Sequence, residues 1–173
     1  IIVLDNGSKI PFNFTEESVR VIRLPANRGN IGGQNACFEY SKFGWVMFVA
    51  NDVRLMPGCL EALYRCRGTG IVQPVLWTEA FEVDNAGLHW IWPGYGISNR
   101  NILRRDTDAF TSSCYLMPKS LWKDLGGFDE SLHSSHEDID FSLRARKTNR
   151  NVQITSVPFA HAIHKGNATL KHT

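Results

Sequence analysis

Short apolar runs alternate with longer segments of helical character, and this alternation limits the fold more than any other feature of the sequence. Apolar runs bounded by turn residues are typical of buried strands, whereas longer amphipathic segments are typical of helices. The predicted strands cover residues 1–4, 19–24, 45–50, 70–76, 109–117 and 152–157, and the predicted helices cover residues 34–43, 59–66, 120–125 and 136–147. Residues 160–173 are predicted to form a tail.

This order of strands and helices predicts an α/β fold with a mostly parallel sheet flanked by helices. The length of 173 residues suits a single domain spanning residues 1–173. The chain opens directly on an apolar run, without Met or a polar lead-in, so we expect a truncated amino terminus. The net charge of +2 is too small to indicate a nucleic-acid partner, and we expect none. No apolar run reaches the roughly 18 residues that a membrane span needs.

The four cysteines follow no metal-binding spacing. None of them forms a CxxC pair, and all lie among apolar residues, so we expect buried free thiols. Free thiols are typical of a reducing compartment, which favours a cytoplasmic location. The four residues are Cys37, Cys59, Cys66 and Cys114.

Two aspartates directly follow predicted strands. Asp5 begins the turn Asp5-Asn6-Gly7-Ser8, and Asp52 follows the very apolar run 45–50. Ligands of parallel α/β sheets bind beyond the carboxyl ends of the strands, so both are candidate site residues. Asp52 could bind a hard divalent cation through oxygen. The alternative for both is a structural turn or capping acid.

The segment 27–33 contains three glycines and precedes a predicted helix. Exposed backbone N–H groups in such a segment can bind an anion such as a diphosphate. The spacing matches neither GxxxxGK[ST] nor GxGxxG, so a plain glycine-rich entry to the helix is an equal alternative.

Acids are dense between residues 129 and 140, beside the glycine corner Gly126-Gly127 and a histidine. Acids at a helix start are usually capping residues, but this density exceeds what capping needs. One of them could act as a general base toward a hydroxyl group. His164, near the end of the chain, is a candidate metal ligand only if it folds back onto Asp52; otherwise it is structural.

Taken in order along the chain, these motifs resemble GT-A glycosyltransferases of family 2, especially the bacterial rhamnosyltransferase-like branch. In that family the first strand would precede Ile1 and help to hold the nucleotide base. The segments that carry the resemblance are DNGS at 5–8, NRGNIGGQNA at 27–36, FVANDVRLMPGCL at 48–60, LWKDLGGFDE at 121–130, HEDIDFSLRAR at 136–146 and VPFAHAIHKGNAT at 157–169.

The resemblance implies a role for each matching position. Asp138, of the Glu137-Asp138 pair, would be the catalytic base, and Asp52 with His164 would hold Mg²⁺ or Mn²⁺ against the donor diphosphate. Gly127 and Phe128 would shape the acceptor side. The implied binding residues for the nucleotide-sugar donor are Asp5, Asn6, Gly7, Asn30, Gly32, Asn35 and Asp52.

The implied function is inverting transfer of a sugar from a UDP-, dTDP- or GDP-sugar to a hydroxyl of a saccharide or lipid-linked acceptor, as in polysaccharide biosynthesis. Such an enzyme would be cytoplasmic, with room for peripheral association at the inner face of the membrane. Loop 90–96 is the expected acceptor contact, and the alternative for it is a hydrophobic flap over the core. Ala50 stands where the metal motif usually has its first acid or amide, and Ser112-Ser113 where smaller residues are common. The alternatives are a non-catalytic nucleotide-binding remnant of the fold and, less favoured, a nucleotidyltransferase.

Overall fold

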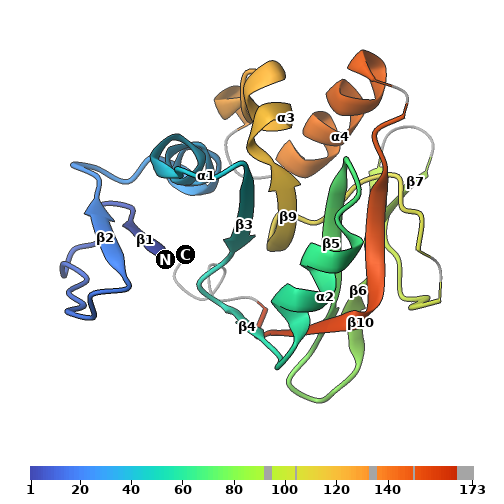
Figure 1. The fold of residues 1–173 in the computed structure, drawn as a ribbon, viewed down its shortest axis with the longest axis horizontal. Coiled ribbons are helices and arrows are strands. Elements are labelled where there is room, and N and C mark those ends of the chain that lie inside the picture. The colour runs from blue at the N-terminus through green and yellow to red at the C-terminus, as the bar shows by residue number, and fades with distance from the viewer. Residues whose placement is uncertain (92–94, 104, 133–135, 150, 167–173) are drawn as a thin grey trace.

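The central element is a six-stranded sheet, seen in Figure 1. This structure is a computed structural model, and it describes residues 1–91, 95–103, 105–132, 136–149 and 151–166. The strand order is β3-β9-β5-β10-β4, with β6 paired to β5. The strands are β3 (Trp45–Val49), β4 (Val53–Leu55), β5 (Ile71–Trp77), β6 (Val83–Asn85), β9 (Cys114–Pro118) and β10 (Ile154–His164).

The α/β class is confirmed, but this sheet is mixed rather than mostly parallel. β5 and β10 run parallel, whereas β9 is antiparallel to β3 and β5, and β4 is antiparallel to β10. β4 follows β3 after a short turn but pairs with β10 rather than with β3, so the two strands stand at opposite ends of the strand order. The predicted tail also changes: β10 continues through residues 160–164, and residues 167–173 lie outside the described part of the chain.

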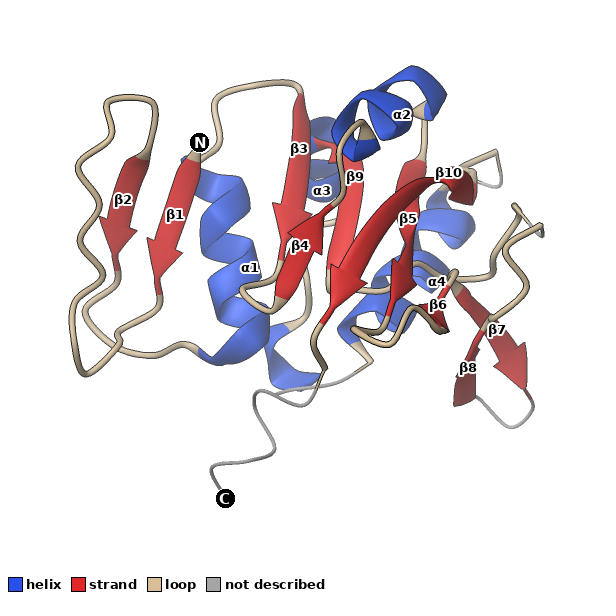
Figure 2. Ribbon diagram, turned by 90° about the horizontal axis from the view of Figure 1, so that it is seen from below, coloured by secondary structure: helices blue, strands red, loops and turns tan. Residues whose placement is uncertain are grey.

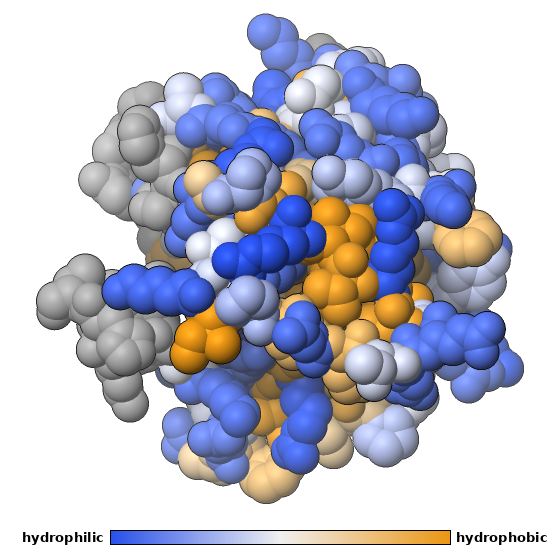
Figure 3. Space-filling view, turned by 90° about the vertical axis from the view of Figure 1, so that its left-hand side faces the viewer, coloured by the Kyte–Doolittle hydropathy of each residue, from blue (hydrophilic) through white to orange (hydrophobic). Residues whose placement is uncertain are grey.

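Two further strands form a separate parallel pair, β1 (Ile2–Asp5) with β2 (Arg20–Arg23). Figure 2 shows β1 and β3 pointing the same way with no strand between them. Helix α1 (Gly29–Tyr40) packs against both β1 and β3 and so connects the pair to the main sheet. Figure 3 faces this side of the molecule and shows apolar residues exposed among charged ones. Ile10, Phe12 and Phe14 are among the exposed apolar residues of the chain.

Helix α1 begins earlier than the sequence predicts. The glycine-rich segment was expected to be a loop up to residue 33, but the helix starts at Gly29 and includes Gly32 and Gly33. These glycines allow close packing. A Cβ at Gly32 would lie 2.7 Å from Cβ of Arg28, and one at Gly33 would lie 3.0 Å from Nδ2 of Asn6.

The sheet has a core on each face, and the alternation of side chains along its strands assigns them. Helices α1 and α4 (Glu137–Thr148) pack with Ile71 of β5 and with Tyr115 and Met117 of β9. Helix α2 (Cys59–Cys66) packs with Val72 and Leu116, the intervening residues of the same strands. Helix α3 (Lys119–Asp124) also contacts the first core, through Leu121 and Trp122.

The long segment between β5 and β9 holds more regular structure than expected. It contains β6 and a hairpin of β7 (Leu88–Ile91) and β8 (Tyr95–Ser98). Residues 92–94 of the predicted acceptor loop lie outside the described residues, so that prediction stays open. None of the helices in the described ranges combines the length and apolar character needed to cross a membrane.

Candidate functional site

Asp52 lies in the turn that ends β3. The backbone N–H of Val53 donates to the carbonyl oxygen of Ala50 at 3.0 Å, and the N–H of Lys165 donates to the carbonyl oxygen of Asp52 at 2.9 Å. The turn is therefore fixed at both ends by backbone hydrogen bonds, and one of them comes from the end of β10.

His164 is brought to Asp52 by strand pairing. β4 and β10 are antiparallel, with His164 opposite Val53. The Nε2 atom of His164 lies 3.4 Å from Oδ2 of Asp52, and both side chains are largely shielded from solvent. The sequence analysis made His164 a candidate metal ligand only if it folds back near Asp52. The β4–β10 register brings it there.

Sequence reasoning missed Asp84. Its Oδ2 atom lies 2.7 Å from Nδ1 of His164, on the side of the ring opposite Asp52. Asp84 lies on β6, within a segment that carried no regular pattern, so nothing in the sequence predicted that it returns to β5 and reaches His164. Across the described residues, no group of three or more His, Cys, Asp or Glu side chains converges as a metal site.

Asp138 lies at the start of α4 and is held by two backbone donors. The N–H of Ser112 donates to its Oδ2 at 3.2 Å, and the N–H of Ile139 donates to its Oδ1 at 2.8 Å. Burial, and secondarily the negative charge of Glu137, raise the pKa of Asp138 to about 6, although the two N–H groups oppose this rise. A carboxylate with a raised pKa is a stronger base than an ordinary one.

Glu137 belongs to a buried polar network. Its Oε1 atom accepts hydrogen bonds from Nδ2 of Asn30 at 3.0 Å and Nε2 of Gln34 at 3.4 Å. Gln34 in turn accepts a hydrogen bond from the hydroxyl of Tyr115 at 2.8 Å. The network joins α1, α4 and β9. Within it, the Nδ2 group of Asn30 donates its hydrogen bond to Glu137.

Asp5 is buried at the end of β1 and accepts several hydrogen bonds. The backbone N–H groups of Ser8 and Phe12 donate to it at 2.9 and 3.1 Å, and Arg23 forms an ion pair with it. The Ser8 hydrogen bonds are the main cause of a pKa lowered to about 2, with smaller contributions from Phe12 and Arg23. Asp5 thus organises the loop between β1 and β2.

Asn6 and Gly7 connect this loop to the start of α1. Asn6 donates to the carbonyl oxygen of Gly29 at 2.8 Å and accepts from the N–H of Arg28 at 3.0 Å. Gly7 has a φ of +70°, and a Cβ there would lie 2.4 Å from the backbone of Ala26. No side chain therefore fits at position 7, where the loop passes close to Ala26.

Asn35 holds the turn that contains Gly127 and Phe128. Its Nδ2 donates to the carbonyl oxygen of Phe128 at 2.9 Å and to Glu130 at 3.0 Å, and its Oδ1 accepts from the Phe128 N–H at 2.9 Å and from Trp122 at 3.3 Å. These bonds occupy the hydrogen-bonding capacity of the amide.

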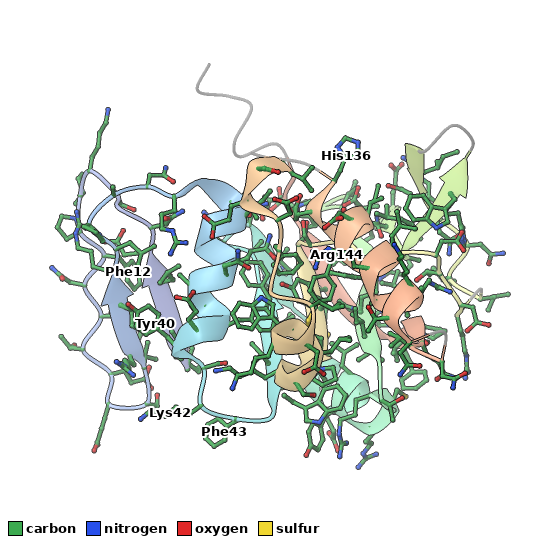
Figure 4. The ribbon with its side chains drawn as sticks, turned by 90° about the horizontal axis from the view of Figure 1, so that it is seen from above. Phe12, Tyr40, Lys42, Phe43, His136 and Arg144 are labelled. Atoms are coloured by element: carbon green, nitrogen blue, oxygen red, sulfur yellow. The ribbon has the colours of Figure 1, made fainter. Side chains whose placement is uncertain are left out.

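A second clamp on the same turn comes from Arg144. Figure 4 shows Arg144 on α4 on the side toward α3, while His136 lies at the helix start. Arg144 donates to the carbonyl oxygens of Leu125 at 2.8 Å and Gly127 at 2.9 Å. The glycine corner is thus fixed from both α1 and α4.

The fold and the sequence were compared with those of known proteins. The sequence profile described as Glycosyl transferase family 2 matches residues 1–126. The chain belongs to this family. Two curated relatives are an uncharacterised protein of Sinorhizobium fredii, 28% identical over 99% of this chain, and the pre-mycofactocin glycosyltransferase of Mycobacterium tuberculosis, 27% identical over 83% of it. The family 2 chain spans 22% of the first relative and 33% of the second.

Solved structures establish the GT-A glycosyltransferase fold. GalNAc-T7, crystallised with UDP, GalNAc and Mn²⁺, matches with a TM-score of 0.72 at 13% identity, over 95% of this chain and 37% of its own. S. aureus TarS 1–349 in complex with UDP matches with a TM-score of 0.59 at 16% identity, over 95% of this chain and 50% of its own. Family and fold together identify a glycosyltransferase domain.

Proposed function

We propose that this domain transfers a sugar, with inversion, from a nucleotide-diphosphate sugar to a hydroxyl group of a saccharide or lipid-linked acceptor. The observation that carries the proposal is the placement of Asp52 and Asp138. The N–H of Ala50, two residues before Asp52, donates to the carbonyl oxygen of Ser113 at 2.9 Å, and the adjacent Ser112 binds Asp138. Both carboxylates therefore belong to one end of the sheet.

In this proposal the donor lies between the two carboxylates. Asp138 accepts the proton of the acceptor hydroxyl as its oxygen forms a bond to the anomeric carbon. The bond from that carbon to the diphosphate oxygen breaks, and the nucleoside diphosphate leaves with the electron pair. Attack from the face opposite the leaving group inverts the configuration. Asn6 and Gly7 shape the nucleotide side beside Asp5, while Gly127 and Phe128 shape the acceptor side.

The Asp52–His164 pair suits a divalent cation. Two ligands of one ion at about 2.1 Å lie about 3.0 Å apart at an angle of about 90°, and about 3.4 Å apart when the angle opens to roughly 110°. The observed separation of 3.4 Å between Nε2 and Oδ2 falls in this range. Mg²⁺ or Mn²⁺ held there would neutralise the negative charge that develops on the leaving diphosphate. The Mn²⁺ and UDP of the GalNAc-T7 crystal support this assignment.

A thermal-shift panel tests the proposal. The protein would be heated with UDP-, dTDP- and GDP-sugars, each with and without Mn²⁺. We expect stabilisation by one nucleotide class, larger with Mn²⁺, because a ligand that binds only the folded state raises the melting temperature. An absence of any shift in all combinations would contradict donor binding.

Ala50 supports a second candidate, a domain that binds nucleotides without transferring sugar, because its methyl group offers no ligand where the family motif usually has one. Hydrolysis or transfer assays on the donor found in the panel separate the two. Donor binding without turnover, in wild type and Asp138→Asn alike, would favour the binding domain. Turnover that Asp138→Asn abolishes while donor binding remains would favour the enzyme.

A further inference from the structure

The ring of His164 lies between two carboxylates, one at each nitrogen. Nδ1 is 2.7 Å from Oδ2 of Asp84, and Nε2 is 3.4 Å from Oδ2 of Asp52. An ionised carboxylate only accepts hydrogen bonds, so the short contact requires that Nδ1 carry the proton. In the neutral ring, Nε2 then presents its lone pair toward Asp52.

We propose that Asp84 is a positioning residue that fixes the tautomer and the orientation of His164, so that Nε2 and Asp52 together face a divalent cation. The inference rests on the proposed function, because it concerns the same cation site. Histidines that bind metals commonly donate their other N–H to a carboxylate, which also increases the basicity of the ligating nitrogen.

The strand register shows how Asp84 comes to point at His164. In the antiparallel pairing of β5 with β6, Leu76 lies opposite Asn85 and Trp77 lies opposite Val83. The register shifts between these pairs, and Asp84 is the additional residue. A bulge of this kind redirects one side chain and is often found beside functional sites.

Strand β5 lies between the strands that carry Asp84 and His164. Trp77 of β5 pairs with Val83 on one side and with Ile163 of β10 on the other, so the neighbours of Asp84 and His164 are held by one strand. Asp84 remains about one-third exposed, at 36% of its side-chain area, whereas His164 is 20% exposed. Asp84 is thus the more exposed member of the pair, and we expect its removal to leave the core intact.

Two measurements on Asp84→Ala test the role. In protein labelled with ¹⁵N-histidine, NMR of the metal-free form reports which ring nitrogen is protonated, and the His164 signals are assigned by their loss in His164→Gln. We expect the Nδ1–H tautomer in wild type and a mixture in Asp84→Ala. Titration calorimetry with MnCl₂ in the presence of UDP should show an affinity about 10- to 100-fold weaker than wild type.

The chain offers a matched control in a second aspartate–histidine pair. Oδ2 of Asp108 lies 3.2 Å from Nδ1 of His89. Asp108→Ala should leave the Mn²⁺ affinity and the His164 tautomer unchanged. Asp84→Asn, which keeps an acceptor oxygen, should lose less affinity than Asp84→Ala, and it serves as the test variant if the alanine form does not fold.

The outcomes separate the two proposals. Unchanged Mn²⁺ affinity and an unchanged His164 tautomer in Asp84→Ala would overturn the role of Asp84 and leave the proposed function standing. If wild type binds no Mn²⁺ with or without UDP, the metal-dependent function fails and the cation role of Asp84 fails with it. If Mn²⁺ binds and His164→Gln does not weaken it, His164 is not a ligand, and the role of Asp84 is overturned while the proposed function stands.

Discussion

The backbone N–H of Ala50 donates a hydrogen bond of 2.9 Å to the carbonyl oxygen of Ser113. This bond continues the β3–β9 pairing beyond Val49 and Cys114. On one side of it the chain leads to Asp52, and on the other Ser112 donates to Asp138. Ala50 and Ser113 thus connect the turn that carries Asp52 to the segment whose Ser112 N–H binds the carboxylate of Asp138.

The pH dependence of transfer should follow Asp138. Its pKa is raised to about 6, chiefly by burial, so the carboxylate becomes available as a base only as the pH rises through about 6. We expect kcat/KM to increase over that range, and Asp138→Asn to lower kcat by about 10²- to 10⁴-fold. Initial rates between pH 5 and pH 8, each with donor binding measured alongside, provide the check. A rate that does not change between about pH 5 and pH 7 would remove Asp138 as the base.

Glu137 should tune that profile. Its negative charge is the second cause of the raised pKa of Asp138. Glu137→Gln removes the charge and keeps a carbonyl oxygen for Asn30 and Gln34, so the pKa of Asp138 should fall. The ascending limb of the pH profile should therefore move to lower pH. A limb at the wild-type position would show that the charge of Glu137 does not reach the base.

Asp5 should contribute acid-sensitive stability. Its folded pKa of about 2 lies below the ordinary value of 3.8. A group with a lowered folded pKa stabilises the protein above the unfolded value, and this contribution is lost as the pH falls from about 4 toward 2. Urea unfolding at several pH values in that window should show a weaker pH dependence for Asp5→Asn than for wild type. Asp124→Asn, at the exposed end of α3, is the control and should retain the wild-type dependence.

The sequence predicted most strands because their apolar runs are bounded by glycine or other turn residues. It predicted most helices because they are longer amphipathic segments. It could not predict β4 and β6, since three residues carry no periodicity and pairing alone makes them strands. The predicted start of α1 at residue 34 was wrong for a different reason, because the helix includes the preceding glycines. Glycine usually interrupts a helix, but here Gly33 allows the close approach of the Asn6 side chain, which is a tertiary contact.

The candidate site was predictable where residues follow strand ends, as Asp52 does, or match an ordered family motif, as Asp138 does. The approach of His164 to Asp52 depended on the β4–β10 register, and Asp84 on a register shift in β6. Neither the β4–β10 register nor the register shift in β6 can be predicted from the residues of one strand alone. The donor-binding roles of Asn30, Gly32 and Asn35 stay predictions, and for Asn35 the engaged amide favours an indirect contribution through the turn that contains Gly127 and Phe128.

Asn35 should be important for stability. Asn35→Ala leaves the N–H and carbonyl oxygen of Phe128 without their partners in a buried position, and an unsatisfied buried group costs about 1–3 kcal/mol. We expect the free energy of unfolding to fall by about 2–4 kcal/mol. Chemical unfolding of this variant beside Asn151→Ala, which alters an exposed asparagine, measures the effect. If the free energy of unfolding fell no more than in Asn151→Ala, water would be replacing the hydrogen bonds of Asn35 to Phe128.

The cysteines should differ sharply in reactivity, although the sequence predicted buried thiols for all four. All are free, but Cys66 is exposed at the end of α2, Cys37 is half-buried, and Cys59 and Cys114 are buried. Burial raises the pKa of Cys37 and of Cys59 to about 11 and that of Cys114 still further, which leaves little thiolate to react. With excess DTNB at pH 8, one thiol should react rapidly in the native protein and four after unfolding. Cys66→Ser should remove the rapid phase, and a rapid phase that survives this substitution would show that a less exposed thiol, such as the half-buried Cys37, reacts readily in the native protein.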